Sequence, residues 1–525
     1  MSDIIVIGSG FAGLATAIRL QAQGHRVQII EKRPKIGGRS YQLIDRDYVF
    51  DMGPSLITAP DLIDAVFASA GKRTEDYVNI VPLDPFYRIY FDDGRFFEYT
   101  GDQARMEAEI ARFNPADVAG YRRFMAGVQE IYERAFADLA HQPFLRRADF
   151  AQILPELVRL KAIRSVYGYV ASHISDPHLR MVFSFHPLFL GGNPFRASSI
   201  YAIIPYLERM GGVHFAMGGM YSLVEGFARL FTELGGTITT DASVAEITIT
   251  DGRAHGVRTD DGRTYAADIV VSNADVANTY REMIAPQWRR RWTDHRIGRM
   301  RYSMSSFLLY LGLDRHYDKF KHHTILIGDR YKGLVNDIFG GRMAEDFSIY
   351  LHAPTMTDPS MAPPGHESVY LLIPVPHLGS DEVDWQRDGD IFRDRIVNYL
   401  EHDFGLTDFS QAITVEHRFT PLDFERELGA YLGTGWQMEP TLFQSAYFRP
   451  HNRSEDVRGL YIAGAGTHPG AGLPGVLLSA EITAGLVERD APKLGTSRSR
   501  TPRGGPQTEP QRVWAGHGGR GLPVD

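Results

Sequence analysis

The 525-residue chain contains no cysteine. Disulfide bonds, thiolate catalysis, iron–sulfur clusters and cysteine-ligated zinc are therefore excluded. The sequence also lacks any run of about 18 uninterrupted apolar residues, the length that a membrane-spanning helix requires. Its net charge of −8 gives no general attraction to nucleic acid, and no basic patch with interleaved aromatic residues occurs. We expect no nucleic-acid partner, and we expect any contact with a membrane to be peripheral.

The length and composition indicate a globular protein with more than one structural region. Hydrophobic residues make up 43% of the chain and charged residues 23%. Helical patterns prevail between about residues 102 and 212, most clearly at 117–139 and 149–170. A strand pattern follows at 238–249. After residue 493 the chain is rich in Gly, Pro, Arg and Ser without apolar periodicity, so we predict a disordered tail.

The strongest local pattern lies at the start of the chain. Residues 4–7 (IIVI) predict a strand buried on both faces, and glycines in G-x-G-x-x-G spacing separate it from a helical pattern. Gly8 allows a tight turn, Gly10 lets the backbone approach a pyrophosphate, and Gly13 allows close packing of helix on strand. The free N–H groups at the helix start favour phosphate. We therefore predict a dinucleotide site, the alternative being a glycine turn in an unrelated α/β unit.

The residues after the second strand narrow the choice of dinucleotide. That strand, residues 27–30, ends on Glu31, 18 residues after the last of the three glycines, where a carboxylate can accept from ribose hydroxyls. Gly37 and Gly38 then allow close backbone approach, and Arg39 can reach a phosphate or the flavin side. This segment resembles the extended signature of the glutathione-reductase-like FAD proteins. The alternative for Arg39 alone is a solvated surface arginine.

Longer motifs extend the resemblance over the chain to about residue 490. They are GSGFAG at 8–13, FSFHPLFLGGNPF at 183–195, VSNADVANTY at 271–280, QSAYFRPHN at 444–452 and LYIAGAGTHPGAGLPGV at 460–476. In their order and spacing they are similar to those of the bacterial and fungal-type phytoene desaturases, the FAD-dependent carotenoid desaturases.

The resemblance implies an α/β fold. It comprises a Rossmann-like FAD-binding domain of the glutathione-reductase/amine-oxidase type with interleaved substrate-binding and helical membrane-facing regions. The FAD-binding domain is expected to be discontinuous. The predicted boundaries are 1–85, 213–300 and 455–492 for the FAD-binding domain, 86–101 and 301–454 for the substrate-binding domain, 102–212 for the helical insert and 493–525 for the disordered tail.

The resemblance also implies the residues that bind FAD. Those for its ADP part are Gly8, Gly10, Phe11, Ala12, Gly13, Glu31, Lys32, Gly38 and Arg39, with the backbone of Val244 at the adenine. Those for the ribityl chain and the flavin are Gly464, Gly466, Gly475 and Val476. The glycines before residue 476 also open a helical pattern, and a helix N-terminus favours the negative charge of reduced flavin.

The reaction implied is the removal of hydrogens from adjacent carbons of phytoene and of partly desaturated carotenoids, giving neurosporene or lycopene. One hydrogen leaves as hydride to the flavin and the other as a proton, with quinone or oxygen as the final electron acceptor. Such a hydrocarbon needs a long apolar tunnel. The aromatic stretch at 183–195 supplies material for a tunnel and equally for an ordinary core.

No catalytic base stands out. Asp149 matches a family position proposed for acid–base work, but Gln152 stands where some relatives have arginine, and a helix N-cap is the alternative role. The histidines show no metal-ligand spacing, so we predict no metal site. His322 and His323 are adjacent and are expected to point apart on a strand.

Other functions on the same scaffold stay open. One is a related carotenoid oxidoreductase or isomerase, or an amine oxidase. Amine oxidases normally have a flavin-site lysine, and an acid where Ala465 stands here. Another is a non-catalytic prenyl-lipid carrier, an architecture in which the flavin contacts have been lost.

We expect docking on the cytoplasmic side of the cell membrane, as a peripheral protein, because the substrate partitions into the bilayer. The predicted docking region is residues 154–206. An apolar helix face flanked by cations is typical of interfacial helices, although a buried helix with solvated cations is equally consistent. The apolar residues are Leu154, Leu157, Leu160 and Ile163, and the cations are Arg159, Lys161 and Arg164.

Overall fold

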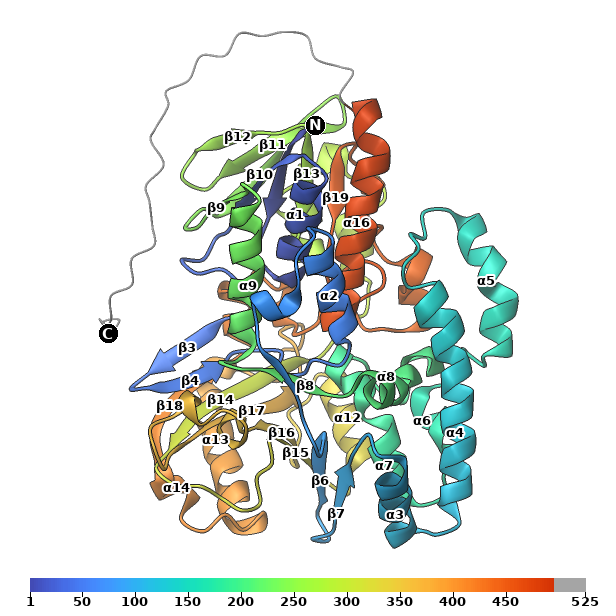
Figure 1. The fold of residues 1–525 in the computed structure, drawn as a ribbon, viewed down its shortest axis with the longest axis vertical. Helices are drawn as coiled ribbons and strands as arrows, with labels where there is room; N and C mark the ends of the chain where they lie inside the picture. Colours follow the sequence, from blue (N-terminus) through green and yellow to red (C-terminus); the bar gives the residue numbers. More distant parts are fainter. Residues whose placement is uncertain (495–525) are drawn as a thin grey trace.

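The computed structural model describes residues 1–494, without the side chains of Ala135, Asp138, Lys493 and Leu494. It forms an upper and a lower lobe with a helical region on one side (Figure 1). Residues 493 and 494 of the predicted disordered tail end a helix, and the rest of that tail lies outside the described residues.

A five-stranded parallel sheet forms the centre of the upper lobe (Figure 1). Its strands in spatial order are β19 (Leu460–Ile462), β13 (Ile269–Ser272), β1 (Asp3–Ile7), β2 (Arg26–Ile30) and β9 (Thr237–Thr239). β1, the first of these strands in the sequence, and β19, the last, both pair with β13. The site built on this sheet therefore needs both ends of the chain.

Both faces of the parallel sheet are covered, as the apolar strand pattern predicts. Ile4 and Val6 of β1 pack into the core formed with the helices α1 (Phe11–Ala22), α2 (Pro60–Ala68), α9 (Met220–Glu233) and α16 (Leu473–Leu494). Ile5 and Ile7 point to the opposite face, into the core formed with the antiparallel strands β10 (Val244–Thr250), β11 (Arg253–Thr259) and β12 (Thr264–Ala266). This confirms the predicted α/β fold class.

A seven-stranded mixed sheet forms the lower lobe. In spatial order it contains β18 (Ile413–Phe419), β14 (Ser305–Leu313), β17 (Glu367–Val375), β16 (Ser348–His352), β15 (His323–Ile327), β6 (Tyr87–Phe91) and β7 (Phe96–Tyr99). Two ribbons join the lobes, β3 (Gln42–Asp45) with β4 (Tyr48–Asp51), and β5 (Ile80–Pro82) with β8 (His214–Ala216). The remaining helices of the upper and lower lobes are α10 (Val276–Arg281), α11 (Asp294–Gly298), α12 (Tyr331–Phe339), α13 (Trp385–Asn398), α14 (Phe409–Ala412) and α15 (Pro421–Arg426).

The helical insert lies beside both lobes (Figure 1). It contains α3 (Gln103–Phe113), α4 (Asp117–Ile131), α5 (Arg147–Arg159), α6 (Val166–Ala171), α7 (Pro177–Ser184) and α8 (Ile204–Gly211). Among the described residues, no helix combines the length and the apolar character needed to cross a bilayer.

Two element predictions are wrong in detail. The single helix expected at 149–170 is broken, because α5 ends at Arg159, Lys161 adopts a left-handed φ of 56°, and α6 begins only at Val166. The single strand expected at 238–249 is divided between β9, in the parallel sheet, and β10, in the antiparallel one. Asp241, with φ of 52°, turns the chain between them. The domain boundaries stay a prediction.

Candidate flavin and substrate site

One cavity of about 570 Å³ extends from the carboxyl end of β1 to the mixed sheet. Its upper part is lined by the β1–α1 turn, the loop at residues 37–40 and the start of α16. Its lower part is lined by β14–β17 and by the helical insert. This position, at the carboxyl ends of parallel strands, is where open α/β sheets bind ligands.

The glycine turn has the geometry that its spacing predicts. Gly8 has φ of +91° and leads the chain out of β1. A Cβ on Gly13 would lie 2.2 Å from the carbonyl oxygen of Gly8, so only glycine allows α1 to pack this closely. A Cβ on Gly10 would lie 2.9 Å from Oδ1 of Asn273. Thus Gly10 is confined by the protein itself as well as by the space that a pyrophosphate would need.

Glu31 is buried at the end of β2 and is held by the glycine turn. Its Oε2 accepts hydrogen bonds from the backbone N–H of Ser9 at 2.9 Å and from the Ser9 hydroxyl at 2.6 Å. Its Oε1 accepts from the backbone N–H of Arg33 at 2.9 Å. A carboxylate has about four acceptor positions, so this one is oriented and can still accept from a ribose hydroxyl.

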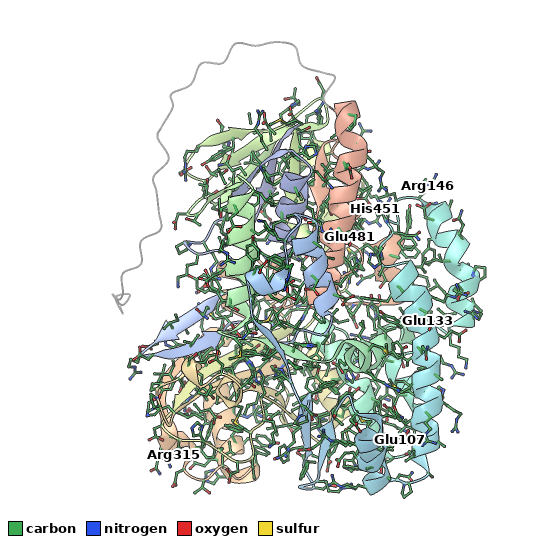
Figure 2. All side chains as sticks on the ribbon, viewed as in Figure 1. Glu107, Glu133, Arg146, Arg315, His451 and Glu481 are labelled. Atoms are coloured by element: carbon green, nitrogen blue, oxygen red, sulfur yellow. The ribbon has the colours of Figure 1, made fainter. Side chains whose placement is uncertain are left out.

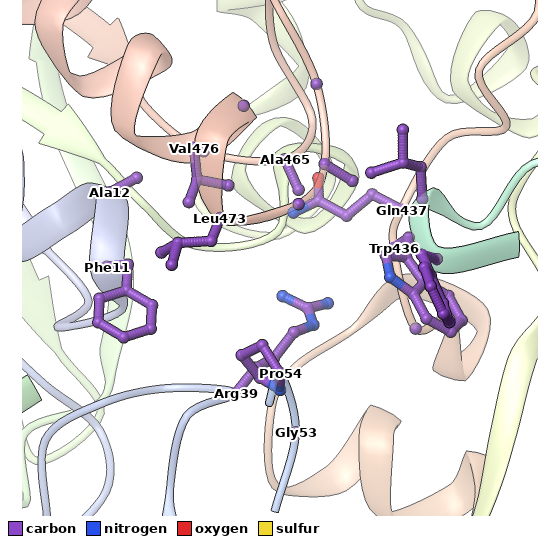
Figure 3. A pocket seen from close by; sticks show the side chains of 18 of the residues that line it. Phe11, Ala12, Arg39, Gly53, Pro54, Trp436, Gln437, Ala465, Leu473 and Val476 are labelled. Carbon is purple, nitrogen blue, oxygen red and sulfur yellow. The ribbon is translucent and has the colours of Figure 1, made fainter. Parts of the chain in front are cut away.

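The guanidinium group of Arg39 reaches into the cavity between Leu473 and Trp436 (Figure 3). Among residues 1–494, its Nε and Nη2 have no hydrogen-bond partner. Burial lowers the pKa of Arg39, and the charge of Asp275 raises it. Conversely, burial raises the pKa of Asp275 while Arg39 lowers it. An unpartnered buried cation facing a cavity fits an acceptor-rich ligand such as a flavin or a phosphate.

The closing loop at residues 464–476 forms the opposite wall. Gly464 has φ of +132°, and a Cβ there would lie 2.8 Å from Nδ2 of Asn273. That same amide donates to the carbonyl oxygen of Ala463 at 2.8 Å. A Cβ on Gly475 would lie 2.7 Å from the carbonyl oxygen of Gly470. The loop is therefore compact, and it presents the N-terminus of α16 to the cavity.

Twelve of the fourteen predicted cofactor-binding residues line the cavity, and their contacts with FAD stay a prediction. They are Gly8, Gly10, Phe11, Ala12, Glu31, Lys32, Gly38, Arg39, Val244, Gly464, Gly475 and Val476. The other two, Gly13 and Gly466, do not line it. Gly466 serves packing, because a Cβ there would lie 2.1 Å from Oε1 of Gln437.

Asp149, the candidate base, does not line the cavity. It occupies the third position of α5, where its carboxylate accepts from the backbone N–H groups of Arg146 at 2.9 Å and Leu145 at 3.2 Å. Figure 2 labels Arg146 at the start of this helix. The sequence offered a helix N-cap as the alternative role of Asp149, but the N-cap residue is Arg146. Asp149 instead acts from the third helical position, as the acceptor of a capping box.

Three site residues were not predicted. Asn273 lies between the first glycine turn and the closing loop, and Asp275 faces Arg39. Arg449 is buried and donates from Nη1 to the carbonyl oxygen of Ala465 at 2.7 Å and from Nε to that of Gln444 at 2.7 Å. All three lie within the motifs VSNADVANTY and QSAYFRPHN. Membership in these motifs was the only feature of the sequence that could have identified them as site residues.

The lower part of the cavity is lined mainly by apolar side chains. Of the predicted stretch at 183–195, Phe185 and Phe189 line it, whereas Phe183 and Phe195 do not. The other apolar residues of this part include Leu188, Ile200, Ile203, Ile204, Leu207, Leu308, Ile325, Ile327 and Leu372. This wall fits a hydrocarbon chain without a polar handle.

The histidine prediction is wrong in one respect. His322 and His323 do not point apart, because their ring centroids lie 4.5 Å from each other. His352 joins them, and one ring nitrogen of each of the three lies within 4.8 Å of the others. β15 begins at His323, so His322 lies outside the regular alternation of the strand.

The chain matches the sequence model described as flavin containing amine oxidoreductase over residues 11–487. Among solved structures, a putrescine oxidase triple mutant superposes with a TM-score of 0.63 at 14% identity, covering 93% of this chain and 99% of that one. An oxidoreductase from Methanosarcina mazei gives 0.61 at 18% identity, covering 91% and 98%. These two similarities concern the fold.

Similar proteins of known activity indicate which flavin-dependent oxidoreductases this chain resembles. A lycopene-forming phytoene desaturase from Pseudescherichia vulneris is 48% identical, covering 93% of this chain and 100% of its own length. A neurosporene-forming phytoene desaturase from Rhodobacter capsulatus is 41% identical, covering 94% and 95%. The chain belongs to the FAD-dependent carotenoid desaturases within the flavin-containing amine oxidoreductase family. It is an FAD-dependent oxidoreductase, and the glycine turn, the oriented Glu31 and the unpartnered Arg39 fit that cofactor.

Proposed function

We propose that the chain desaturates phytoene and partly desaturated carotenoids to neurosporene or lycopene. The single observation that carries this proposal is the continuity of the cavity, whose upper part, lined by the predicted FAD-binding residues, opens into an apolar lower part. FAD held by the residues of the upper part would supply the two-electron oxidant. The protein contributes the positioning of the chain along the apolar wall and the exclusion of water around the reacting carbons.

The test is conversion of phytoene in liposomes by the purified holoprotein, with a quinone as electron acceptor and, in a second series, with oxygen. Formation of neurosporene or lycopene with one acceptor equivalent consumed for each new double bond is the expected result. Isomerised carotenoid without acceptor consumption would favour an isomerase. A protein that purifies without flavin and returns phytoene unchanged would favour a lipid carrier.

The proposal includes docking of the protein on the cytoplasmic surface of the cell membrane through α5. The inner face of this helix, with Phe150, Ile153 and Leu157, lines the cavity. On its outer face Leu154 and Val158 are 50% and 60% exposed. A helix that is apolar on both sides can contact lipid with one side and the substrate passage with the other.

The surface that we propose differs from the one that the sequence indicated. Leu157 and Leu160 are buried, so they cannot contact lipid. Arg159 is paired with Glu130 at 2.7 Å and with Glu156 at 2.6 Å, which weakens its value as a cation for anionic lipid. We define the α5 surface as Leu154 and Val158 of α5 together with Ile163 of the turn that follows this helix; Ile163 is 79% exposed.

A further inference from the structure

Each desaturation step has to dispose of a proton inside a cavity that is largely apolar. One hydrogen of the substrate leaves with its bonding electron pair to the bound FAD. The electron pair of the second C–H bond becomes the new π bond, and that hydrogen leaves as a proton. A hydrocarbon has no basic atom of its own, so a group outside the substrate has to accept this proton.

Two hydroxyl groups on the cavity wall are joined to a buried base. Ser55 and Tyr350 both line the cavity, and their hydroxyl oxygens lie 2.5 Å apart. The Tyr350 hydroxyl is also 2.8 Å from Nδ1 of His323, which lies behind the wall. Ser55 directly follows Gly53 and Pro54, which Figure 3 places beside Arg39 in the upper part of the cavity. Ser55 is therefore the next residue along the chain after the wall segment beside Arg39, and both hydroxyls belong to residues of the cavity wall.

From the base, polar contacts continue toward the surface. His352 lies across the β15–β16 pairing from His323, and their rings are stacked with centroids 5.3 Å apart. Nε2 of His352 is hydrogen-bonded to Nε2 of His322 at 3.1 Å. Nδ1 of His322 is hydrogen-bonded to the Thr357 hydroxyl at 2.6 Å. Thr357 is partly exposed, so the series ends at solvent.

We propose that this series conducts the proton of each desaturation step from the cavity to the surface. We name the set the proton relay: Ser55, Tyr350, His323, His352, His322 and Thr357. This inference rests on the proposed function.

One step of the proton relay lacks a direct hydrogen bond. Nε2 of His323 and Nδ1 of His352 have no partner among the described side chains and backbone. One ring nitrogen of each of the two residues lies within 4.8 Å of the other, and we place a bridging water between the two rings as part of the proposal. Unpartnered buried nitrogens at this step are what a water-bridged proton transfer requires.

The protonation states agree with this role. Burial lowers the pKa of His322 to about 3 and holds those of His323 and His352 well below the ordinary value. Each ring is therefore neutral, with one N–H and one lone pair, and can accept a proton on one nitrogen while releasing one from the other. Burial keeps the pKa of Tyr350 well above its ordinary value, so it stays a hydroxyl.

A metal site is the competing interpretation of the three histidines. Both ring nitrogens of His322 and one of His323 are already hydrogen-bonded, to Thr357, His352 and Tyr350. No carboxylate among the described residues joins the group of three. Metal analysis of the purified protein decides between the two: one equivalent of zinc per chain would overturn the proton relay.

The kinetic test measures anaerobic flavin reduction by phytoene in liposomes. We expect Tyr350→Phe and His352→Gln to slow it by about 100-fold while the affinity for FAD stays unchanged. Glutamine keeps a donor and an acceptor but cannot take up and release a proton. Tyr48→Phe is the matched control, because Tyr48 is a buried tyrosine hydrogen-bonded to His366 at 2.5 Å and does not line the cavity. We expect it to retain the wild-type rate.

A solvent isotope effect separates proton transfer from simple misfolding. In deuterium oxide, flavin reduction should slow more in His352→Gln than in the wild type, because proton transfer has become more limiting. Wild-type rates in both relay variants would overturn the proposal. So would loss of reduction in Glu208→Gln alone, since Glu208 is a buried carboxylate on the cavity wall outside the proton relay.

A measurement without substrate keeps the two proposals distinguishable. Nitrogen-15 spectra of the histidine rings should show His322, His323 and His352 neutral from pH 6 to 8, with the His323 signal shifted in Tyr350→Phe. A charged ring in this set would overturn the relay whatever the catalytic outcome. Absence of flavin reduction in the wild type, by contrast, contradicts the proposed function.

Discussion

The buried guanidinium group of Arg449 holds the carbonyl oxygen of Ala465 at 2.7 Å, in the middle of the loop that closes the flavin site. The same side chain donates to the carbonyl oxygens of Gln444 and Met438. One residue thus fixes three backbone segments around the cavity, and the loop owes its position to this residue as well as to its own glycines.

Replacing Arg449 with methionine should therefore destabilise the holoprotein and weaken FAD binding. The three carbonyl oxygens would stay buried without a donor, at about 1–3 kcal/mol for each one left unsatisfied. We expect a clear fall in the apparent melting temperature and a faster release of FAD. Arg418→Met is the control, because Arg418 pairs on the surface with Asp390, which is 81% exposed. Equal melting temperatures for the two variants would contradict this role.

Gly13 and Gly485 offer a matched pair of helical glycines. Gly13→Ala places a methyl group 2.2 Å from a backbone oxygen, so α1 has to move away from β1 and the protein should lose FAD. A Cβ on Gly485 in α16 would meet no described atom within 4 Å, so Gly485→Ala should stabilise by about 0.5–1 kcal/mol. Thermal denaturation followed by flavin fluorescence measures both. A tolerated Gly13→Ala would show that α1 can move away from β1 without loss of the site.

Asp51 gives a pH dependence of stability. Burial raises its pKa to about 7, above the ordinary value of 3.8, although the backbone N–H of Met220 donates to it. The folded state therefore binds the proton more tightly than the unfolded state. The stabilisation of the folded state by this proton is complete below about pH 4 and is lost as the pH rises to about 7.

Asp51→Asn cannot ionise, so its stability relative to the wild type should increase from pH 5 to pH 8, by about 2–4 kcal/mol at most. Apparent melting temperatures at several pH values provide the measurement. Asp47→Asn, at an exposed position, should show no such trend. A constant difference between Asp51→Asn and the wild type across this range would contradict the assigned pKa.

The α5 surface is tested by flotation with liposomes. Leu154→Asn, Val158→Asn and Ile163→Asn combined should reduce the bound fraction without loss of flavin, since each removes exposed apolar area. Ile391→Asn is the control, because Ile391 is 60% exposed on α13 in the lower lobe, outside the helical insert. Unchanged flotation of the triple variant would place the docking surface elsewhere.

The sequence predicted the parts of the site that are local in the chain. The glycine turn, Glu31 and the start of α16 each follow from spacing within one strand–turn–helix unit. Asn273 and Arg449 could not be assigned roles, because their partners at Ala463 and Ala465 depend on how β13 and β19 come together. The meeting of His323 and His352 likewise depends on the register between β15 and β16.

The docking face shows a different limit of sequence-based prediction. A helical period identifies which residues share a side but not which side faces the protein. In α5 both sides are apolar, so Leu157 was assigned to lipid although it lines the cavity. The exposed fractions of Leu154 and Val158 became known only once the helix had been placed on the two lobes.

The pairing of β19 with β13, and of β13 with β1, has a consequence for biosynthesis. The glycine turn is translated more than 450 residues before the loop and helix that complete its binding site. A nascent chain therefore lacks the closing wall of the site until residues 464–476 have been translated. We expect a polypeptide terminated before these residues to be flavin-free even with its glycine turn intact.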